Sequence, residues 1–386
     1  MYNRRSVFIV ACIAIFLFGI GLITLGSVAP MLKAKFHLDE ISAGTLFSIM
    51  PLGILTGSLL FGPLSDRYGY KILLILSGIS MSAGFEGIAY SSSLPILQIC
   101  VFLFGLGGGA INGATNSLVA DISRTKGADL SILGVFFGLG ALSMPFMLAI
   151  LKNILPFWQI VAIVGWITLL GAVFCLLVPF PAPKQSQGFP IAKGLKMLKD
   201  TTMILIAFFL FCQSSFEGII NNWTTSYLTE HLSFPVNNAL YALSLYLAGM
   251  TVIRVLFGTV FRTVPPHKLL FASFAMILPG CVLLKAASSF YLATAGLILF
   301  GAGLGGGFPI MLGYVGNRYT DLSGTAFSFV LVVALVGNML INYLMGTIAE
   351  AYGIQHLITV AFAELAVMIL LSIQIIRKLK IYPKNQ

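Results

Sequence analysis

Residues 62–71 read GPLSDRYGYK, and they separate two long apolar blocks at 41–63 and 71–91. Each block has about the 20 residues that a helix needs to cross the hydrocarbon core of a bilayer. The loop between the blocks is short and polar, so the chain turns tightly and enters the membrane again. This stretch therefore predicts two neighbouring membrane-spanning helices that are joined on one side of the membrane.

Apolar blocks and short connections alternate along the whole chain. Only 9% of the 386 residues are charged, against about 25% in soluble domains, which excludes a water-soluble surface. The blocks lack the apolar–polar alternation of membrane barrel strands. Because lipid offers the backbone no hydrogen-bond partners, helices remain as the spanning structure. We predict an all-α membrane protein with twelve spans, near 6–32, 41–63, 71–91, 94–120, 130–152, 157–179, 200–229, 236–261, 267–288, 290–318, 322–347 and 354–377.

The chain contains an internal repeat. The sequence LGGG at 106–109 recurs at 304–307, an offset of 198 residues, and the loop at 62–71 is paralleled by 258–268 at an offset of about 196. An offset near half the chain length indicates two six-helix halves. Transporters built from parallel repeats bind their substrate near the bilayer midplane, between the repeats.

The two halves are predicted at 1–179 and 200–386. The segment between them, 180–199, is proline-rich and then basic and amphipathic. Such a segment is typical of a linker that lies on the membrane surface.

Basic residues predict the orientation, because cytoplasmic loops are enriched in Lys and Arg. With the N-terminus inside, 17 of the 22 basic residues fall on the inner side, four fall on the outer side, and Arg254 falls within a span. Both termini are therefore expected in the cytoplasm. Anionic lipid beside the inner loops accounts for the net charge of +10, so no nucleic-acid partner is expected. We expect a monomer whose partners are a small solute and membrane lipid.

The loop at 62–71 resembles the signature between helices 2 and 3 of the major facilitator superfamily, G-x-L-x-D-R-x-G-x-K. With twelve spans and a six-plus-six repeat, the resemblance implies the major facilitator fold. Asp66, Arg67 and Lys71 match the charged positions of that signature. We expect Asp66 and Arg67 to pair with charges on neighbouring helices and to hold an inner gate shut. The alternative is a tight turn with solvated charges.

Further stretches resemble the fucose–galactose–glucose proton symporter branch of that superfamily. Glu217 and Trp223 have the six-residue spacing that the branch shows in its seventh helix. The resemblance implies uptake of monosaccharides with protons, across a bacterial inner membrane. Branch members such as fucose permease also carry carboxylates in helices 1 and 4, whereas 6–32 and 94–120 contain none. The matching stretches are 104–121, 134–145, 208–228, 301–309 and 323–327.

Ionisable residues deep in a membrane are costly and are candidates for function. The resemblance places helices 3 and 12 at the periphery, so we interpret Glu86 and Glu364 as carboxyls that are neutral or paired between helices. Arg254 is expected to pair with an acid or to cap carbonyls near a gate. Glu217 is the one carboxylate on a predicted cavity helix, and we assign it to solute binding and proton coupling.

Amides both donate and accept hydrogen bonds, as sugar hydroxyls do. Asn112 and Asn116 are four residues apart and share a helix face, as do Asn338 and Asn342. Amides can also join helices to one another, so both readings stay open. Trp223 is expected either to stack on a sugar ring or to lie in the aromatic belt at the membrane surface. The predicted solute-binding residues are Asn112, Asn116, Gln213, Glu217, Asn221, Trp223 and Asn338, with Asn342 ranked lower.

The glycine runs at 105–109 and 303–307 are not nucleotide loops, because no GK[ST] follows them. They predict close helix packing. No metal-ligand spacing or nucleophile–base arrangement is present. We therefore expect that the protein is not an enzyme and needs no cofactor. We expect a proton gradient to drive transport.

The sequence leads to proton-coupled uptake of a neutral, hydroxyl-rich solute by alternating access. Drug or metabolite efflux by proton antiport is the main alternative. Efflux members usually carry an arginine in helix 4 and a Gly-Pro pair in helix 5, where this chain has Val101 and Gly138-Leu139. Organic-anion transport would need a basic residue in the cavity, and Arg254 is the one candidate. A membrane sensor with a transporter fold remains a further alternative.

Overall fold

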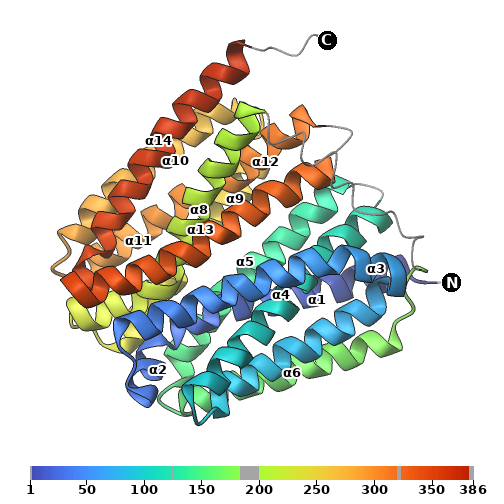
Figure 1. Ribbon diagram of the computed structural model, residues 1–386, viewed down its shortest axis with the longest axis horizontal. Helices are drawn as coiled ribbons and strands as arrows, with labels where there is room; N and C mark the ends of the chain where they lie inside the picture. Colours follow the sequence, from blue (N-terminus) through green and yellow to red (C-terminus); the bar gives the residue numbers. More distant parts are fainter. Residues whose placement is uncertain (1, 124–125, 183–199, 320–322, 382–386) are drawn as a thin grey trace.

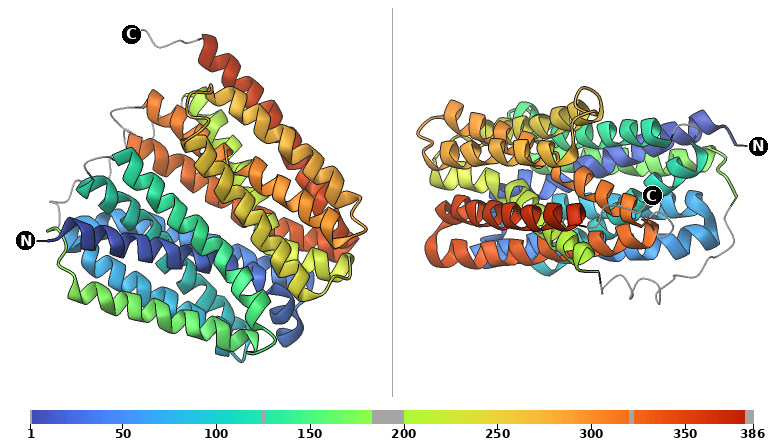
Figure 2. Two further views of the ribbon diagram at one scale, coloured as in Figure 1. Left: turned by 180° about the vertical axis from the view of Figure 1, so that it is seen from behind. Right: turned by 90° about the horizontal axis from the view of Figure 1, so that it is seen from above.

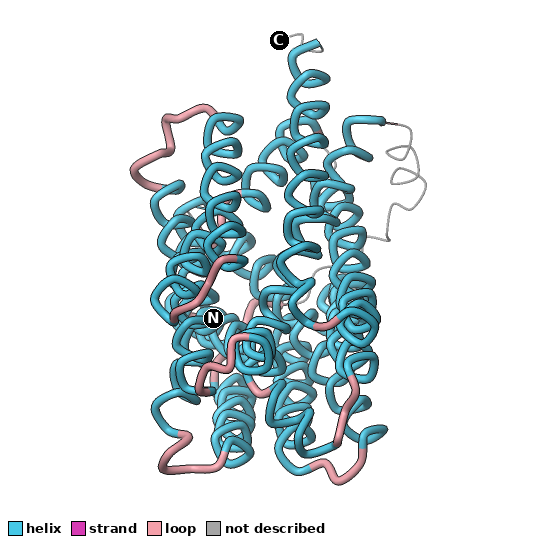
Figure 3. The backbone as a smooth tube through the Cα atoms, turned by 90° about the vertical axis from the view of Figure 1, so that its left-hand side faces the viewer, coloured by secondary structure: helices cyan, strands magenta, loops and turns pink. Residues whose placement is uncertain are grey.

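The computed structural model describes residues 2–123, 126–182, 200–319 and 323–381. Within these ranges every regular element is a helix, and twelve helical segments are long and apolar enough to cross a membrane (Figure 3). The elements are α1 (Arg4–Ser27), α2 (Ala29–Phe36), α3 (Glu40–Tyr90), α4 (Leu94–Ile122), α5 (Lys126–Leu151), α6 (Phe157–Leu177), α8 (Thr201–Ser226), η1 (Tyr227–His231), α9 (Val236–Gly258), α10 (Pro266–Lys285), α11 (Phe290–Leu304), α12 (Gly307–Arg318), α13 (Ser323–Tyr352), η3 (Ile354–His356) and α14 (Leu357–Ile381).

The predicted fold class is confirmed, and most predicted spans end within a few residues of the observed helices. The predicted first span, 6–32, is the exception, because α1 ends at Ser27 and the short helix α2 follows. Pro30 lies in the first turn of α2, where a missing N–H costs nothing. The predicted linker lies outside the described residues from 183 to 199.

Helix α3 contains the stretch at 62–71 and is two spans joined at a sharp bend, Glu40–Phe61 and Arg67–Tyr90. Gly69 makes the bend, with φ 82° and ψ 161°. This backbone region is accessible to glycine and strained for a residue with a Cβ atom. The glycine of the signature therefore has a conformational role that no other residue type can take.

Replacing Gly69 with alanine is expected to destabilise the protein by about 1–3 kcal/mol, the usual cost of placing a Cβ in this backbone region. Thermal unfolding in detergent measures the change. Gly134→Ala is the matched control, because a Cβ at Gly134 meets no atom within 4 Å. An unchanged unfolding temperature for Gly69→Ala would show that the bend tolerates a side chain.

The helices form two groups of six spans, α1–α6 and α8–α14, that meet at one end and diverge toward the other (Figure 1 and Figure 2). Both chain termini lie at the divergent end, here called the open end, and the opposite end is called the closed end. At the interface, α3 packs against α13 and α5 packs against α9. The Ser48 hydroxyl donates across it to the Met339 carbonyl oxygen at 2.7 Å.

Toward the open end, side chains on the central helices are exposed. Asn116 on α4 and Pro309, Gly313 and Asn317 on α12 are all exposed. A Cβ added at Gly313 would meet no atom within 4 Å. These positions on α4 and α12 therefore lie at the surface of the protein, whereas the interface at the closed end is packed.

The prediction that the glycine runs pack helices closely is confirmed. A Cβ at Gly105 or Gly109 would collide with the α3 backbone at Met50 or Ile54. In the second half, a Cβ at Gly303 would approach the Ser273 carbonyl oxygen of α10 to 2.8 Å. The two copies of the run thus bring a central helix against its neighbours in each half.

At the open end, Asp200 joins the start of α8 to the end of α12. Its carboxylate accepts hydrogen bonds from Arg318 Nε at 2.6 Å, from the Tyr319 hydroxyl, and from the Thr202 N–H at 2.9 Å. Burial alone would raise the pKa of Asp200, but these hydrogen bonds outweigh it and lower the pKa. The carboxylate is therefore ionised at neutral pH and fixes the two helix ends together.

Candidate functional site

An ionic network joins the two halves at the closed end. Lys33 of α2 pairs with Glu40 of α3 and with Glu230 of η1, whose Oε1 and Oε2 lie 2.8 and 3.0 Å from Lys33 Nζ. The backbone N–H of Glu40 donates to Glu350 Oε2 of α13 at 3.0 Å. One lysine thus lies among three carboxylates from both halves. None of these four residues was predicted from the sequence as a site residue.

Below this network, Asn342 of α13 connects two spans of the second half. Its Oδ1 accepts from Asn222 Nδ2 and from Trp223 Nε1, both at 3.1 Å. Its Nδ2 donates to the carbonyl oxygen of Asn338 at 2.8 Å, and Asn338 Nδ2 donates to the Ser214 carbonyl oxygen at 3.0 Å. The amides of α13 therefore join it to α8 in this conformation.

Trp223 lies inside the closed interface between the halves, away from any aromatic belt. Its side chain is 0% exposed, and its ring meets Phe47 of α3 edge-on at a centroid distance of 5.2 Å. The Thr225 hydroxyl, two residues further along α8, donates to the Gly26 carbonyl oxygen of α1. A solute has no room on the Trp223 ring while the closed end is packed, and its predicted role in binding stays a prediction.

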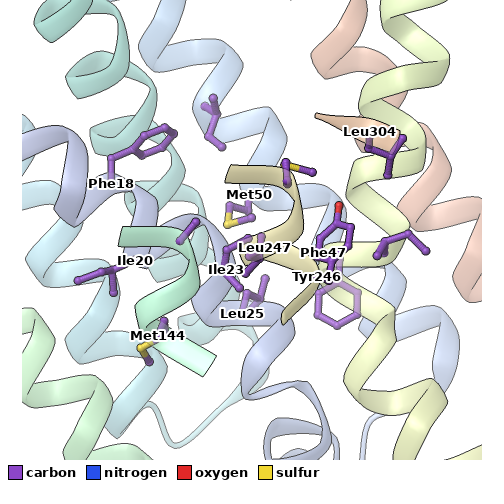
Figure 4. Close-up of a cluster of buried hydrophobic side chains, with 14 of the residues drawn as sticks. Phe18, Ile20, Ile23, Leu25, Phe47, Met50, Met144, Tyr246, Leu247 and Leu304 are labelled. Carbon is purple, nitrogen blue, oxygen red and sulfur yellow. The ribbon is translucent and has the colours of Figure 1, made fainter. Parts of the chain in front are cut away.

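Apolar side chains from both halves form one continuous buried cluster next to these polar contacts. Figure 4 shows it where α1, α3 and α5 approach α9 and α11. The labelled members are Phe18, Ile20, Ile23, Leu25, Phe47, Met50, Met144, Tyr246, Leu247 and Leu304. This cluster blocks passage through the interface toward the closed end.

Replacing Asn342 with alanine is expected to destabilise the protein by about 2–4 kcal/mol, because two buried donors, Asn222 Nδ2 and Trp223 Nε1, lose their acceptor. Thermal unfolding measures this loss. Asn116→Ala is the control, since Asn116 is exposed and, within the described part of the chain, hydrogen bonds only within its own helix turn. Equal stability of the two variants would contradict the role of Asn342.

Glu217 of α8 lies beside Arg254 of α9. Glu217 Oε1 accepts from Gln213 Nε2 at 2.7 Å and lies 3.9 Å from Arg254 Nη2. The side chains of Glu217 and Arg254 are 16% and 29% exposed, so both are partly shielded from solvent. Arg254 thus pairs with an acid and also donates from Nε to the Gly305 carbonyl oxygen at 3.3 Å. Both contacts that the sequence analysis offered as alternatives for Arg254 are present.

The tenth span is interrupted next to this pair. Helix α11 ends at Leu304 and α12 begins at Gly307. Gln213 Nε2 donates to the Leu304 carbonyl oxygen at 2.8 Å, and a Cβ at Gly307 would collide with the Gln213 side chain. Close packing was predicted at this glycine run, but the interruption was not, because glycine residues permit both.

In the first half, Asn112 and Asn116 share a face of α4, as predicted. Asn116 Nδ2 donates to the carbonyl oxygen of Asn112 at 2.8 Å and to Asn112 Oδ1 at 3.1 Å. Asn221 of α8 has a buried Oδ1 with no hydrogen-bond partner among the described residues. These three amides have hydrogen-bonding capacity that the protein does not use fully in this conformation.

The signature loop lies at the open end. Lys71 Nζ donates to the Leu176 carbonyl oxygen of α6 at 2.7 Å, and the Arg67 guanidinium lies 5.2 Å from the centre of the Tyr68 ring. The side chain of Asp66 lies outside the described residues. Lys71 therefore acts within the first half here, and the gate role of Asp66 and Arg67 stays a prediction.

Among the described residues, the carboxyls of Glu86 and Glu364 make no hydrogen bond or ion pair with the groups around Glu217. Glu86 Oε1 is buried without a hydrogen-bond partner among the described residues, close to Gly165 of α6. Glu364 of α14 lies close to Cys212 of α8. Among the described residues there is also no group of three or more His, Cys, Asp or Glu side chains that could hold a metal ion.

Comparison with known proteins places the chain among membrane transporters. The family model described as Major Facilitator Superfamily matches residues 11–340. The chain is 25% identical over 352 residues to the glucose/mannose transporter GlcP of Bacillus subtilis, covering 86% of this chain and 85% of that protein. It is 31% identical over 199 residues to the 4-hydroxybenzoate transporter PcaK of Acinetobacter baylyi, covering 51% of this chain but only 42% of that transporter.

The fold has close counterparts among solved structures. The crystal structure of a D-xylose–proton symporter superposes with a TM-score of 0.80, covering 96% of this chain and 97% of the other. The two sequences are 13% identical, so this similarity concerns the fold.

Proposed function

Because the chain belongs to the Major Facilitator Superfamily, we propose that it takes up a neutral, hydroxyl-rich solute such as a monosaccharide together with protons. The chain is an integral membrane transporter and not an enzyme, as its family establishes. The proposal concerns the solute, the direction of transport and the coupling ion.

The observation that carries the proposal is the pairing of Glu217 with Arg254 at 3.9 Å, supported by Gln213 at 2.7 Å. While Glu217 is ionised, the pair has no net charge, so an uncharged solute fits beside it better than an ion does. Gln213 and the amides of Asn112, Asn116, Asn221 and Asn338 supply donors and acceptors suited to hydroxyl groups. Protonation of Glu217 would couple the solute to the proton gradient.

The conformation fits alternating access. The packed interface lies opposite the chain termini, and the bias of basic residues assigns the termini to the cytoplasm. On this assignment the protein faces inward, and rocking of the two halves would break the Lys33 network and open the opposite end. Trp223 and the amides around Asn342 would then become accessible to a solute.

The relatives support a solute of this class. GlcP is named as a glucose/mannose transporter and matches most of the chain. The superposed structure is named as a symporter of D-xylose and protons.

A second candidate is uptake of an organic anion. Arg254 is 29% exposed, and neutralisation of Glu217 would leave its positive charge without a partner. The match to the 4-hydroxybenzoate transporter PcaK favours such a solute, although it covers about half of the chain.

Uptake into proteoliposomes tests these proposals. Labelled sugars, polyols, aromatic acids and drugs are offered with and without an inward proton gradient. The proposal expects a sugar or polyol to accumulate only with the gradient. Accumulation of aromatic acids alone would favour the second candidate, and gradient-driven movement of drugs in the outward sense would indicate antiport. Absence of any solute exchange would indicate a sensor.

A further inference from the structure

The interruption of the tenth span leaves a backbone carbonyl without its helical donor. In a continuous helix the Gly305 carbonyl would accept from the N–H of residue 309. Residue 309 is proline, which has no N–H. Arg254 Nε donates to the Gly305 carbonyl oxygen instead, at 3.3 Å. A side chain of α9 thus completes the backbone hydrogen bonding of another helix.

The neighbouring carbonyl has a similar partner. Gln213 Nε2 of α8 donates to the Leu304 carbonyl oxygen at 2.8 Å, at the last residue of α11. Gln213 is 1% exposed, so water cannot readily replace it there. Two side chains from two different helices therefore hold the interruption from the same side.

Both side chains also contact Glu217. The Gln213 amide donates to Glu217 Oε1 at 2.7 Å, and the Arg254 guanidinium faces the same oxygen at 3.9 Å. One carboxylate oxygen therefore orients the two donors that hold the Leu304 and Gly305 carbonyls. No other described contact of Glu217 leads to the tenth span.

We propose that Gln213 and Arg254 are positioning residues that transmit the charge state of Glu217 to the interruption between α11 and α12. The proposal rests on the proposed function, in which Glu217 takes up the coupling proton. An ionised Glu217 fixes Gln213 through a charge-assisted hydrogen bond and Arg254 through the ion pair, and these donors fix the carbonyls. A proton on Glu217 removes the charge, loosens both donors and frees α12 to tilt.

The surroundings of Glu217 allow this transmission. The charged or titratable groups that face it among the described residues are Arg254 and Tyr246, both on α9. Helix α13 contributes the amide of Asn338, which carries no charge. Glu364 of α14 lies close to Cys212. Arg254 is thus the one cation among these groups. Neutralising Glu217 would leave the charge of Arg254 without a partner.

Hydrogen–deuterium exchange of the full-length protein in lipid nanodiscs tests the proposal. Glu217→Gln imitates the protonated side chain and is compared with the wild type at one pH. We expect the backbone amides at 305–312 to exchange about tenfold faster in the variant, the effect of losing one charge-assisted hydrogen bond. Glu86→Gln is the control, because Glu86 lies in the other half and should leave this segment unchanged.

A second variant perturbs the interruption without altering Glu217. Gly307→Ala displaces the Gln213 side chain, since the added Cβ would collide with it. We expect faster exchange at 305–312 at every pH. Adding Glu217→Gln should then give a smaller increase than it gives alone, because only Arg254 still responds to Glu217. Additive effects of the two changes, or unchanged exchange in Glu217→Gln alone, would overturn the proposal.

Transport kinetics separate this proposal from the proposed function. Arg254→Lys keeps the charge, and we expect it to retain gradient-driven uptake with a shifted pH profile and little change in KM. Arg254→Gln should lose the pH dependence. If Glu217→Gln abolishes gradient-driven uptake without changing exchange at 305–312, coupling through the interruption fails while the proposed function stands. If no hydroxylated solute is transported but the exchange result holds, the proposed function fails while coupling through the interruption stands.

Discussion

Replacing Lys33 with methionine is expected to open the closed end. Lys33 is 12% exposed and lies between Glu40 and Glu230, and the Glu40 N–H holds Glu350 close by. Without the lysine, carboxylates of both halves face one another across the interface with no cation between them. We expect the closed end to lose about 2 kcal/mol, a value below that of a fully buried pair because Glu230 is 36% exposed. This corresponds to a change of roughly 30-fold in the ratio of closed to open molecules.

The opening can be measured as alkylation of one buried position. Ser27→Cys is introduced where the serine is 0% exposed at the interface, in a background that lacks the five native cysteines. A membrane-impermeant maleimide should label it faster when Lys33→Met is present. Lys35→Met is the control, since Lys35 donates to the Ala89 carbonyl oxygen within the first half. Equal labelling rates in both variants would show that the network does not hold the halves together.

Glu217→Gln is expected to abolish accumulation driven by the proton gradient. One proton per solute across a gradient of two pH units supports about a 100-fold accumulation, because each unit contributes about 1.36 kcal/mol. A glutamine keeps the hydrogen-bonding shape of the side chain but binds no proton. The internal solute concentration should therefore approach the external one, with no accumulation.

Counterflow of solute across preloaded proteoliposomes distinguishes loss of coupling from loss of binding. We expect Glu217→Gln to retain counterflow, since binding and the rocking of the halves need no net proton movement. Glu86→Gln should retain both activities, because its carboxyl lies in the first half, away from Arg254. Accumulation in the Glu217→Gln variant would show that another residue is the coupling group.

The positions of the spans follow from the sequence because the bilayer imposes a single solution on the backbone. Each apolar block must satisfy its own hydrogen bonds, so block length alone places Phe157–Leu177 and Phe290–Arg318 within a few residues. The loop at 62–71 identified the two-span form of α3, and Gly69 provides its bend. The glycine runs predicted packing for the same reason, since a helix without side chains on one face can approach another closely.

The contacts between distant residues could not be predicted in this way. Lys33 and Glu230 are 197 positions apart, and their pairing depends on how the halves meet, which block length does not encode. Glu217 and Arg254 were each identified as costly charges, but their proximity follows from the packing of α8 against α9. Asn342 ranked low as a solute-binding residue, yet it holds Asn222 and Trp223 because faces of α13 and α8 meet there.

The length of α12 determines how far its far end moves when the helix tilts at the interruption, at Gly305 and Gly306. The helix has 12 residues, which at 1.5 Å per residue makes a rod about 18 Å long. A tilt of about 10° at one end of such a rod displaces its other end by about 3 Å, roughly the diameter of a water molecule. That far end carries Arg318, which is held by Asp200 at the start of α8. A small angular change beside Glu217 would therefore pull directly on the first turn of the seventh span.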